Sequence, residues 1–500
     1  MRFSKSLLFG AILLILSVSA VSAQEDPLLF PVDTYTEETV TVTTSNGDVE
    51  VTYRLYEHLP YVANPVDVDY QSLDVKVPVS INGEAVDATN APMLFVINVG
   101  GYMSVNNAEG GAGVGAPIGG LTGGGAPRGM GGAAGNDSGV SGTSDLALAA
   151  GYVVVVPGVR GRDNQADDGT YYGKAPAAIV DLKAAVRYIR HNDEIMPGNA
   201  DWIISRGTSA GGALSALLGA SGNSDEYDVY LAALGAADED DSIFASADYC
   251  PITDLDHADI AYEWEFGTTA RNGSLVDQAV SQQLAASFAE YLAALNLQDA
   301  DGTPLTADTY GDYLVQTYLI PSANAYLLAL SEEERSAYLT ENSWITWADS
   351  SASFTFEAYV AHIGRSKGSP AFDNFELSSA ENILFGTETI NARNFTDFSL
   401  QQSSGDSTAT IDPDLQAVVN LMNPMYFITQ GGSDIAQYWW IRQGSSDTDT
   451  ALPVLADLAT SLGNQGLDVN ALLYWDAGHG ADEDPEAFIA WIGEITGYNQ

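Results

Sequence analysis

The stretch from Trp202 to Leu214 constrains this chain more than any other. Its first residues, 202–204, are apolar and predict a buried strand, while residues 213–220 are small and compatible with a helix. Between them, Gly207-Thr208-Ser209-Ala210-Gly211 matches G-x-S-x-G. A sharp strand-to-helix turn strains the backbone of the serine, and glycines on either side avoid collisions with the adjoining elements. The stretch therefore predicts an exposed nucleophilic hydroxyl at Ser209.

The N-terminus has the pattern of a secretory signal peptide. Arg2 and Lys5 precede an apolar run at residues 7–16, and Val21-Ser22-Ala23 places small residues before a cleavage point. We expect cleavage after Ala23 and a secreted or periplasmic protein. No later segment approaches the roughly 20 consecutive apolar residues of a membrane span.

Charge and cysteine content exclude several classes of function. The chain has 67 acidic and 18 basic residues, a formal net charge of −49, so nucleic acid and anionic membranes are not expected partners. Cys250 is the only cysteine, which rules out an internal disulfide, and we expect a buried, inert thiol. No H-E-x-x-H motif or other ligand cluster is evident, so neither a metal nor a cofactor is expected.

Strand and helix patterns predict a mostly parallel, twisted sheet with flanking helices. An amphipathic helix at 177–191 lies between two apolar strands, which indicates a right-handed βαβ unit. Segment 109–142 is rich in Gly, Ala and Ser, lacks a Walker A ending, and is expected to be a loop or insertion. The predicted strands are residues 39–42, 49–53, 74–81, 93–99, 152–156, 202–204, 245–249, 425–429, 438–442 and 469–475.

The middle of the chain lacks this βαβ rhythm. Residues 251–420 are acidic and aromatic, with helical stretches such as 275–297 and 332–348. We interpret them as a large cap or lid inserted into the sheet domain. The expected organisation is a signal peptide (1–23), the first part of the core (24–250), the inserted lid (251–420) and the second part of the core (421–500).

A nucleophilic serine needs a histidine base oriented by a carboxylate, and after a G-x-S-x-G turn the chain order is serine, acid, histidine. Of the five histidines, only His479 follows the last predicted strand. Asp447 lies between strand 438–442 and a helical run at 451–462, which makes it the expected acid, with Asp434 as the alternative.

Ester chemistry at such a serine also needs hydrogen-bond donors for the oxyanion. One donor should be the backbone N–H of Ala210, which directly follows the nucleophile. The other should come from Gly101 or Tyr102, at the end of strand 93–99, and the sequence does not choose between them.

Three longer motifs resemble those of bacterial tannases, serine esterases of the α/β-hydrolase fold related to feruloyl esterases. They are residues 207–216 (GTSAGGALSA), 248–255 (DYCPITDL) and 442–450 (RQGSSDTDT). The resemblance implies a catalytic triad of Ser209, Asp447 and His479. It also implies that Lys367, Glu381 and Asp449 bind the phenolic hydroxyls of the substrate.

The expected protein is therefore a cofactor-independent, secreted serine esterase that hydrolyses galloyl esters, with a small phenolic ester as its partner. Two other hypotheses stay open at this point. One is a feruloyl or acetylxylan esterase acting on plant cell-wall carbohydrate. The other, of a different class, is a catalytically inactive hydrolase-fold protein used as a binding module.

Overall fold

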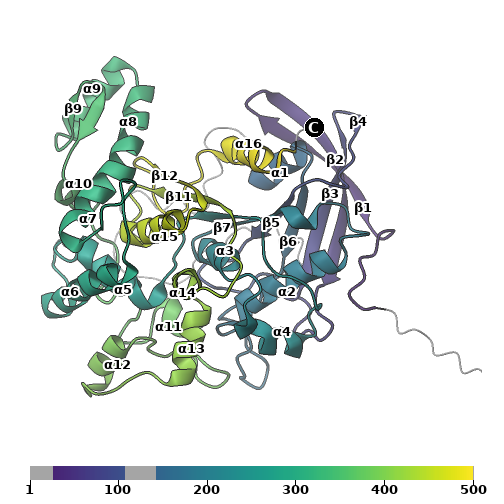
Figure 1. Cartoon of the computed structure of the whole chain (residues 1–500), viewed down its shortest axis with the longest axis horizontal. Coiled ribbons are helices and arrows are strands. Elements are labelled where there is room, and N and C mark those ends of the chain that lie inside the picture. The colour runs from purple at the N-terminus through teal and green to yellow at the C-terminus, as the bar shows by residue number, and fades with distance from the viewer. Residues whose placement is uncertain (1–25, 107–141, 499–500) are drawn as a thin grey trace, which may run out of the picture.

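A computed structural model describes residues 26–106 and 142–498 (Figure 1). The predicted signal peptide lies outside the described residues, as does the Gly-rich segment 109–142 except for Gly142. Among the residues described, no helix combines the length and apolar character needed to cross a membrane.

Ten strands form one main sheet, whose path runs β1-β2-β3-β6-β5-β7-β8-β11-β12, with β4 beside β3. The first strands pair antiparallel, and every pair from β6 to β12 is parallel. The strands are β1 Thr36–Thr44, β2 Gly47–Pro60, β3 Ser72–Ile81, β4 Glu84–Ala85, β5 Met93–Ile97, β6 Val153–Pro157, β7 Ile203–Thr208, β8 Ala245–Tyr249, β11 Tyr438–Gly444 and β12 Asp468–Tyr474.

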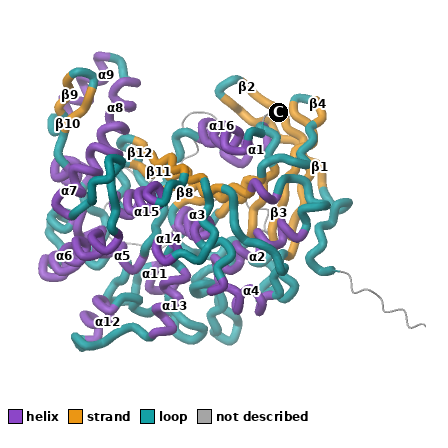
Figure 2. The backbone as a smooth tube through the Cα atoms, viewed as in Figure 1, coloured by secondary structure: helices purple, strands orange, loops and turns teal. Residues whose placement is uncertain are grey.

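Both faces of this sheet are covered, which explains why β5 is apolar at every position. Met93, Phe95 and Ile97 join one hydrophobic cluster, and the alternating Leu94 and Val96 join a second. Helices α2 Ala177–His191, α3 Ala210–Ala220 and α15 Leu452–Asn464 contribute to the first cluster. Helices α1 Thr143–Ala149 and α16 Pro485–Thr496 contribute to the second. These two helices lie next to each other (Figure 2). The predicted mostly parallel sheet with flanking helices is confirmed.

The strand predicted at 425–429 is wrong, because these residues lie in helix α14 Pro424–Gln430. Asn423 caps this helix by accepting the N–H of Met425, and Pro424 occupies its first turn, where a missing N–H costs nothing. Local capping therefore decides the structure of an apolar run that also suits a buried strand. The helix predicted at 332–348 is also too long: it ends at Glu341, and Thr346–Ala348 forms β9.

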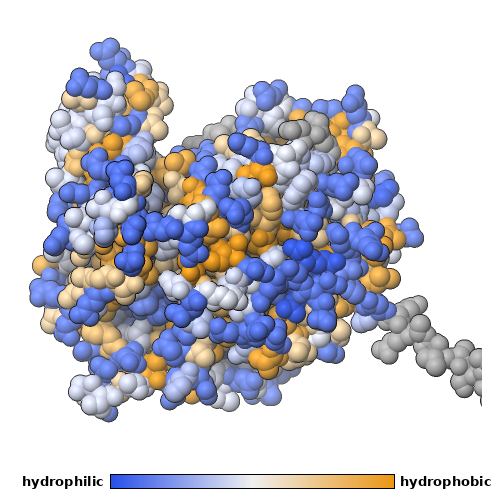
Figure 3. Space-filling model, viewed as in Figure 1, coloured by the Kyte–Doolittle hydropathy of each residue, from blue (hydrophilic) through white to orange (hydrophobic). Residues whose placement is uncertain are grey.

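Between β8 and β11 the chain leaves the main sheet. Only a small β9–β10 hairpin and helices lie there, and part of this segment stands up as an arm at α8 and α9 (Figure 1). The visible face is hollowed between this arm and the end bearing β1–β4, with apolar residues gathered at its centre (Figure 3). Besides α14, the elements between β8 and β11 are α5 Leu255–Phe266, α6 Gln278–Leu295, α7 Ala307–Leu314, a π-helix at Val315–Leu319, α8 Ile320–Ala329, α9 Glu332–Glu341, β9 Thr346–Ala348, β10 Ser351–Ser353, α10 Phe356–Ile363, α11 Ala380–Leu384, α12 Asp397–Ser404 and α13 Pro413–Leu421. Short helices elsewhere are Ala200–Trp202, Asp225–Tyr227 and α4 Asp228–Leu234.

A buried carboxyl on α15 makes the fold sensitive to pH. Burial raises the pKa of Asp457 to about 8, although a hydrogen bond from the Tyr310 hydroxyl opposes the shift. The charge of Asp254 adds to it, and that of His257 opposes it. The folded protein therefore holds this carboxyl neutral at a pH where the unfolded chain, with a pKa near 3.8, has already ionised. The contribution of this group to the free energy of unfolding is largest below the unfolded pKa and is lost as the pH rises towards the folded pKa.

We expect Asp457→Asn to weaken this pH dependence, because an amide has no proton to lose. Between pH 5 and pH 8 the free energy of unfolding of the parent should fall more steeply than that of the variant, by up to about 1.4 kcal/mol per pH unit. Urea denaturation of both proteins at several pH values measures the two slopes. Parallel slopes would show that Asp457 is already ionised in the folded state.

Candidate active site

The serine motif forms the sharp turn that its sequence predicts. Ser209 follows β7 directly, has φ 61° and ψ −121°, and precedes the first residue of α3. A Cβ at Gly207 would lie 2.1 Å from the carbonyl oxygen of Gly211, and a Cβ at Gly211 would lie 2.7 Å from that of Ile97. Backbone contacts this close leave room only for glycine at both positions.

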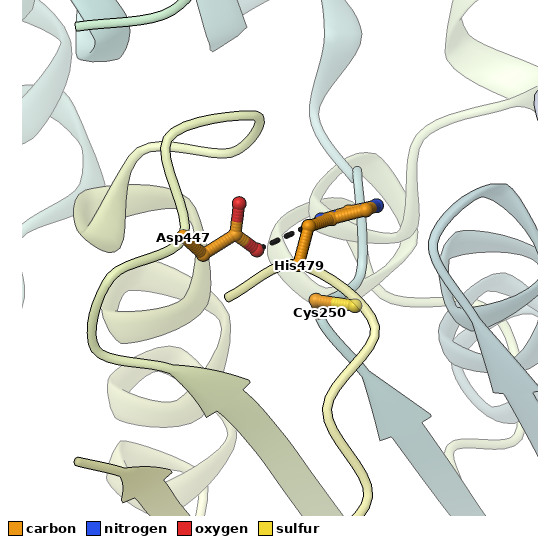
Figure 4. Close-up of side chains that lie close together, drawn as sticks. All are labelled: Cys250, Asp447 and His479. Atoms are coloured by element: carbon orange, nitrogen blue, oxygen red, sulfur yellow. Dashed lines mark hydrogen bonds and ion pairs between the residues drawn. The ribbon is translucent and has the colours of Figure 1, made fainter. Parts of the chain in front are cut away.

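The structure brings Ser209, His479 and Asp447 into one hydrogen-bonded chain. Nε2 of His479 lies 2.9 Å from Oγ of Ser209, and Nδ1 lies 2.9 Å from Oδ2 of Asp447 (Figure 4 shows the second contact). Asp447 is 2% exposed, and its Oδ1 accepts the backbone N–H groups of Asp449 and Thr450. These bonds fix the carboxylate so that its other oxygen faces the imidazole.

Electrostatics favours proton transfer from serine to histidine. Burial lowers the pKa of the His479 imidazole. The charge of Asp447 and its hydrogen bond together raise that pKa by more than burial lowers it, so the net shift is upward. An imidazole with a raised pKa holds a proton more strongly once it has accepted one. The arrangement can therefore stabilise the imidazolium that forms as Ser209 attacks a carbonyl carbon.

The alternative acid, Asp434, lies elsewhere. It precedes β11, whereas Asp447 follows the same strand, so the two carboxylates are at opposite ends of it. The backbone of Asp434 pairs with Gly222, and its Oδ2 accepts a hydrogen bond from Asn223 at 2.8 Å. Ser209 and His479 follow the parallel strands β7 and β12, at the sheet edge where Asp447 also lies.

The predicted oxyanion donors lie where β5 meets the serine turn. A Cβ at Gly211 would lie 2.8 Å from the carbonyl oxygen of Val99, so the end of β5 is packed against the start of α3. Gly101 and Tyr102 both have positive φ, 54° and 57°. Among the described residues, no acceptor takes the N–H of Gly101, Tyr102 or Ala210. All three amides remain available to a substrate oxygen.

The segments that bear Lys367 and Asp449 lie beside each other, as contacts of the preceding residues show. Oγ of Ser366 donates to the carbonyl of Thr448 at 2.7 Å. The hydroxyl of Tyr262 donates to the same carbonyl and accepts the N–H of Lys367 at 3.0 Å. The segment bearing Lys367 is thus bound to the loop bearing Asp447 and Asp449.

Glu381, on α11, lies near residues 100–102, which carry two of the predicted oxyanion donors and are called the oxyanion loop below. It is 7% exposed, and its charge adds to the effect of burial in raising the pKa of the Tyr102 hydroxyl. The neighbouring Asn382 donates to Asp373 at 2.8 Å, which connects α11 to the segment that follows Lys367. No hydrogen bond between described residues joins the three predicted binding residues directly.

Sequence reasoning missed Arg162. Its Nε donates to the carbonyl of Gly101 at 2.7 Å, and its N–H donates to that of Tyr102 at 2.9 Å. These bonds hold the carbonyl groups of Gly101 and Tyr102, whose N–H groups have no acceptor among the described residues. The available signal was the polar segment 158–163, which follows a buried strand at the same sheet edge.

Two groups of potential metal ligands, neither evident from the sequence, occur among the described residues. One consists of Asp254, Asp256 and His257, beside a cavity of about 220 Å³. The other is formed by Cys250, Asp447 and His479 (Figure 4).

Comparison with known proteins finds a family model and several solved structures that are similar to this chain. A family model described as BD-FAE matches residues 128–305, and no curated protein matches the chain. A tannin acyl hydrolase from Lactobacillus plantarum has 34% sequence identity and a TM-score of 0.78, covering 94% of this chain and 98% of its own. The Fusobacterium nucleatum tannase has 35% identity and a TM-score of 0.77, covering 94% and 99%. A tannin acyl hydrolase solved in complex with ethyl gallate has 34% identity and a TM-score of 0.78, covering 94% and 98%.

Proposed function

This chain belongs to the bacterial tannase family, and on that premise we propose that it is a secreted serine esterase that hydrolyses galloyl esters. The observation that carries the proposal is the hydrogen-bonded chain from Ser209 through His479 to Asp447, placed at a serine turn. Export rests on the sequence pattern of residues 1–23 alone. N-terminal sequencing of the mature protein checks it, and a chain that still begins at Met1 would contradict cleavage.

In the proposed mechanism, His479 accepts the hydroxyl proton of Ser209 as Oγ attacks the ester carbonyl carbon. The N–H of Ala210, with that of Gly101 or Tyr102, stabilises the resulting oxyanion. The imidazolium, held by Asp447, gives its proton to the departing alcohol oxygen, which leaves a galloyl ester on Ser209. Water then attacks this ester, His479 takes and returns a proton in the same way, and gallate is released.

We further propose that Lys367, Glu381 and Asp449 recognise the phenolic hydroxyls. A carboxylate accepts hydrogen bonds from these hydroxyls, and an ammonium donates to their oxygens. The segment bearing Lys367 contacts the loop bearing Asp447 and Asp449, and the charge of Glu381 acts on Tyr102 of the oxyanion loop. A ring bearing several hydroxyls, whose ester carbon lies at Ser209, could contact residues from both regions at once.

Parallel assays on a gallate ester and a benzoate ester of the same alcohol test this recognition. Lys367→Met, Glu381→Gln and Asp449→Asn should each cost about 1.5–3 kcal/mol of transition-state stabilisation on the gallate ester, roughly ten- to hundredfold in kcat/KM. The benzoate ester has no hydroxyls to lose and should change little. Equal losses on both esters would mean that the three residues only maintain the structure.

The same panel separates the two enzyme hypotheses. Methyl gallate and methyl ferulate, each followed by release of the free acid, should give a strong preference for gallate. A preference for ferulate would favour the feruloyl esterase alternative. Failure to hydrolyse any ester, together with an unreactive Ser209, would favour the inactive binding module.

A further inference from the structure

We propose that Cys250, His479 and Asp447 form a binding site for a thiophilic divalent cation such as Zn²⁺ or Cd²⁺, and that an ion bound there inhibits the esterase. One ligand atom from each residue lies within 4.8 Å of the other two (Figure 4). Metal binding at this site does not depend on the proposed function. Only its inhibitory effect does.

The position of the thiol follows from the backbone. Cys250 is the first residue after β8, with φ 39°, and its N–H donates to the carbonyl of Arg442 on β11. Its Sγ accepts the N–H of Gly480 at 3.2 Å, so the sulfur contacts the loop that carries His479.

The donor set suits a soft cation. Thiolate and imidazole are preferred ligands of zinc and cadmium, and a carboxylate completes a three-residue set that leaves one position for water. Zinc bonds of about 2.0–2.3 Å in a tetrahedral arrangement require ligand atoms roughly 3.3–3.8 Å apart. Atoms already within 4.8 Å of one another therefore need shifts of about 1 Å. The thiol releases its proton to solvent when the metal binds.

Access favours a small ion over an organic reagent. Cys250 is 1% exposed, whereas 24% of the His479 side chain is exposed. An ion can therefore approach from the exposed imidazole, whose loop contacts the sulfur. Once bound, it occupies the imidazole and the carboxylate that would otherwise move the proton of Ser209. Lys367, Glu381 and Asp449 keep their places, so recognition of the phenolic ring should survive.

Cadmium titration of the purified full-length protein tests the proposal with two separate readouts. The first is the ultraviolet charge-transfer band of a cadmium–thiolate bond, which should saturate at one equivalent. The second is the rate at which a fluorophosphonate probe labels Ser209, which should fall at least tenfold. The probe avoids gallate, whose vicinal hydroxyls would chelate the metal. Removing cadmium with EDTA should restore labelling and abolish the band together.

Two variants locate the site. Cys250→Ser keeps an acceptor for the N–H of Gly480, so cadmium-free labelling should stay within a few-fold of the parent, while both the band and the inhibition disappear. His257→Gln disables the second ligand group and should be inhibited like the parent. Inhibition that persists in Cys250→Ser, or a band without loss of labelling, would overturn the proposal.

If Cys250→Ser does not fold, as judged by circular dichroism, Cys250→Ala replaces it. The parent alone also decides the matter: the band and the inhibition must share one midpoint in cadmium concentration, and different midpoints refute the site. A protein whose Ser209 never reacts would contradict the proposed function, yet the cadmium band would still report on the thiol.

Discussion

Ser209→Ala is expected to lower kcat for hydrolysis of a gallate ester by about 10⁴- to 10⁶-fold. Without Oγ no acyl-enzyme can form, and the only remaining help comes from substrate binding and the oxyanion donors. The methyl group of alanine fits wherever the serine side chain fits, so the fold should be unchanged. Free gallate, measured directly after incubation with methyl gallate, reports the loss.

A matched control is Ser433→Ala. Ser433 lies in the loop before β11, at the opposite end of that strand from Asp447. Its hydroxyl donates to the carbonyl of Ala220, the last residue of α3. This variant should keep its activity. Ser209→Ala should still bind gallate in calorimetry, because the proposed recognition residues are untouched. Activity of Ser209→Ala within roughly tenfold of the parent would exclude Ser209 as the nucleophile.

The second large effect is expected from Asp447→Asn, which should lower kcat by about 10⁴-fold. An amide at this position can donate to Nδ1 of His479, which then carries its proton on Nε2 and cannot accept the proton of Ser209. The hydrogen bonds from the N–H groups of Asp449 and Thr450 to Oδ1 can persist, so the loop should keep its shape. The loss would therefore be chemical and not structural.

Asp434→Asn is the control for this substitution. Asp434 contacts Gly222 and Asn223 at the other end of β11, so its replacement should change kcat by less than a few-fold. Assays of both variants on the same gallate ester give the ranking. A severe loss in Asp434→Asn with a mild loss in Asp447→Asn would indicate that Asp434, and not Asp447, is the catalytic acid.

Local sequence patterns determined much of this protein. The G-x-S-x-G turn specifies its own backbone, because only glycine fits at Gly207 and Gly211. The fully apolar run of β5 requires a sheet covered on both faces, and the helix predicted at 177–191 coincides with α2. The order of strands and helices after Ser209 was enough to select His479 as the candidate base, since the other histidines fall before the serine or within residues 251–420. These features follow from the order and the spacing of residue types along the chain.

Only the tertiary structure decided which distant residues meet. Asp434 and Asp447 both follow apolar runs, and what separates them is that β11 runs between them, parallel to its neighbours. Arg162 donates to the carbonyl of Gly101, 61 residues away, and Cys250 accepts the N–H of Gly480, 230 residues away in the loop that carries His479. Sequence periodicity records which face of an element is buried, whereas the pairing of loops at one sheet edge depends on strand order, which is set when the whole core packs.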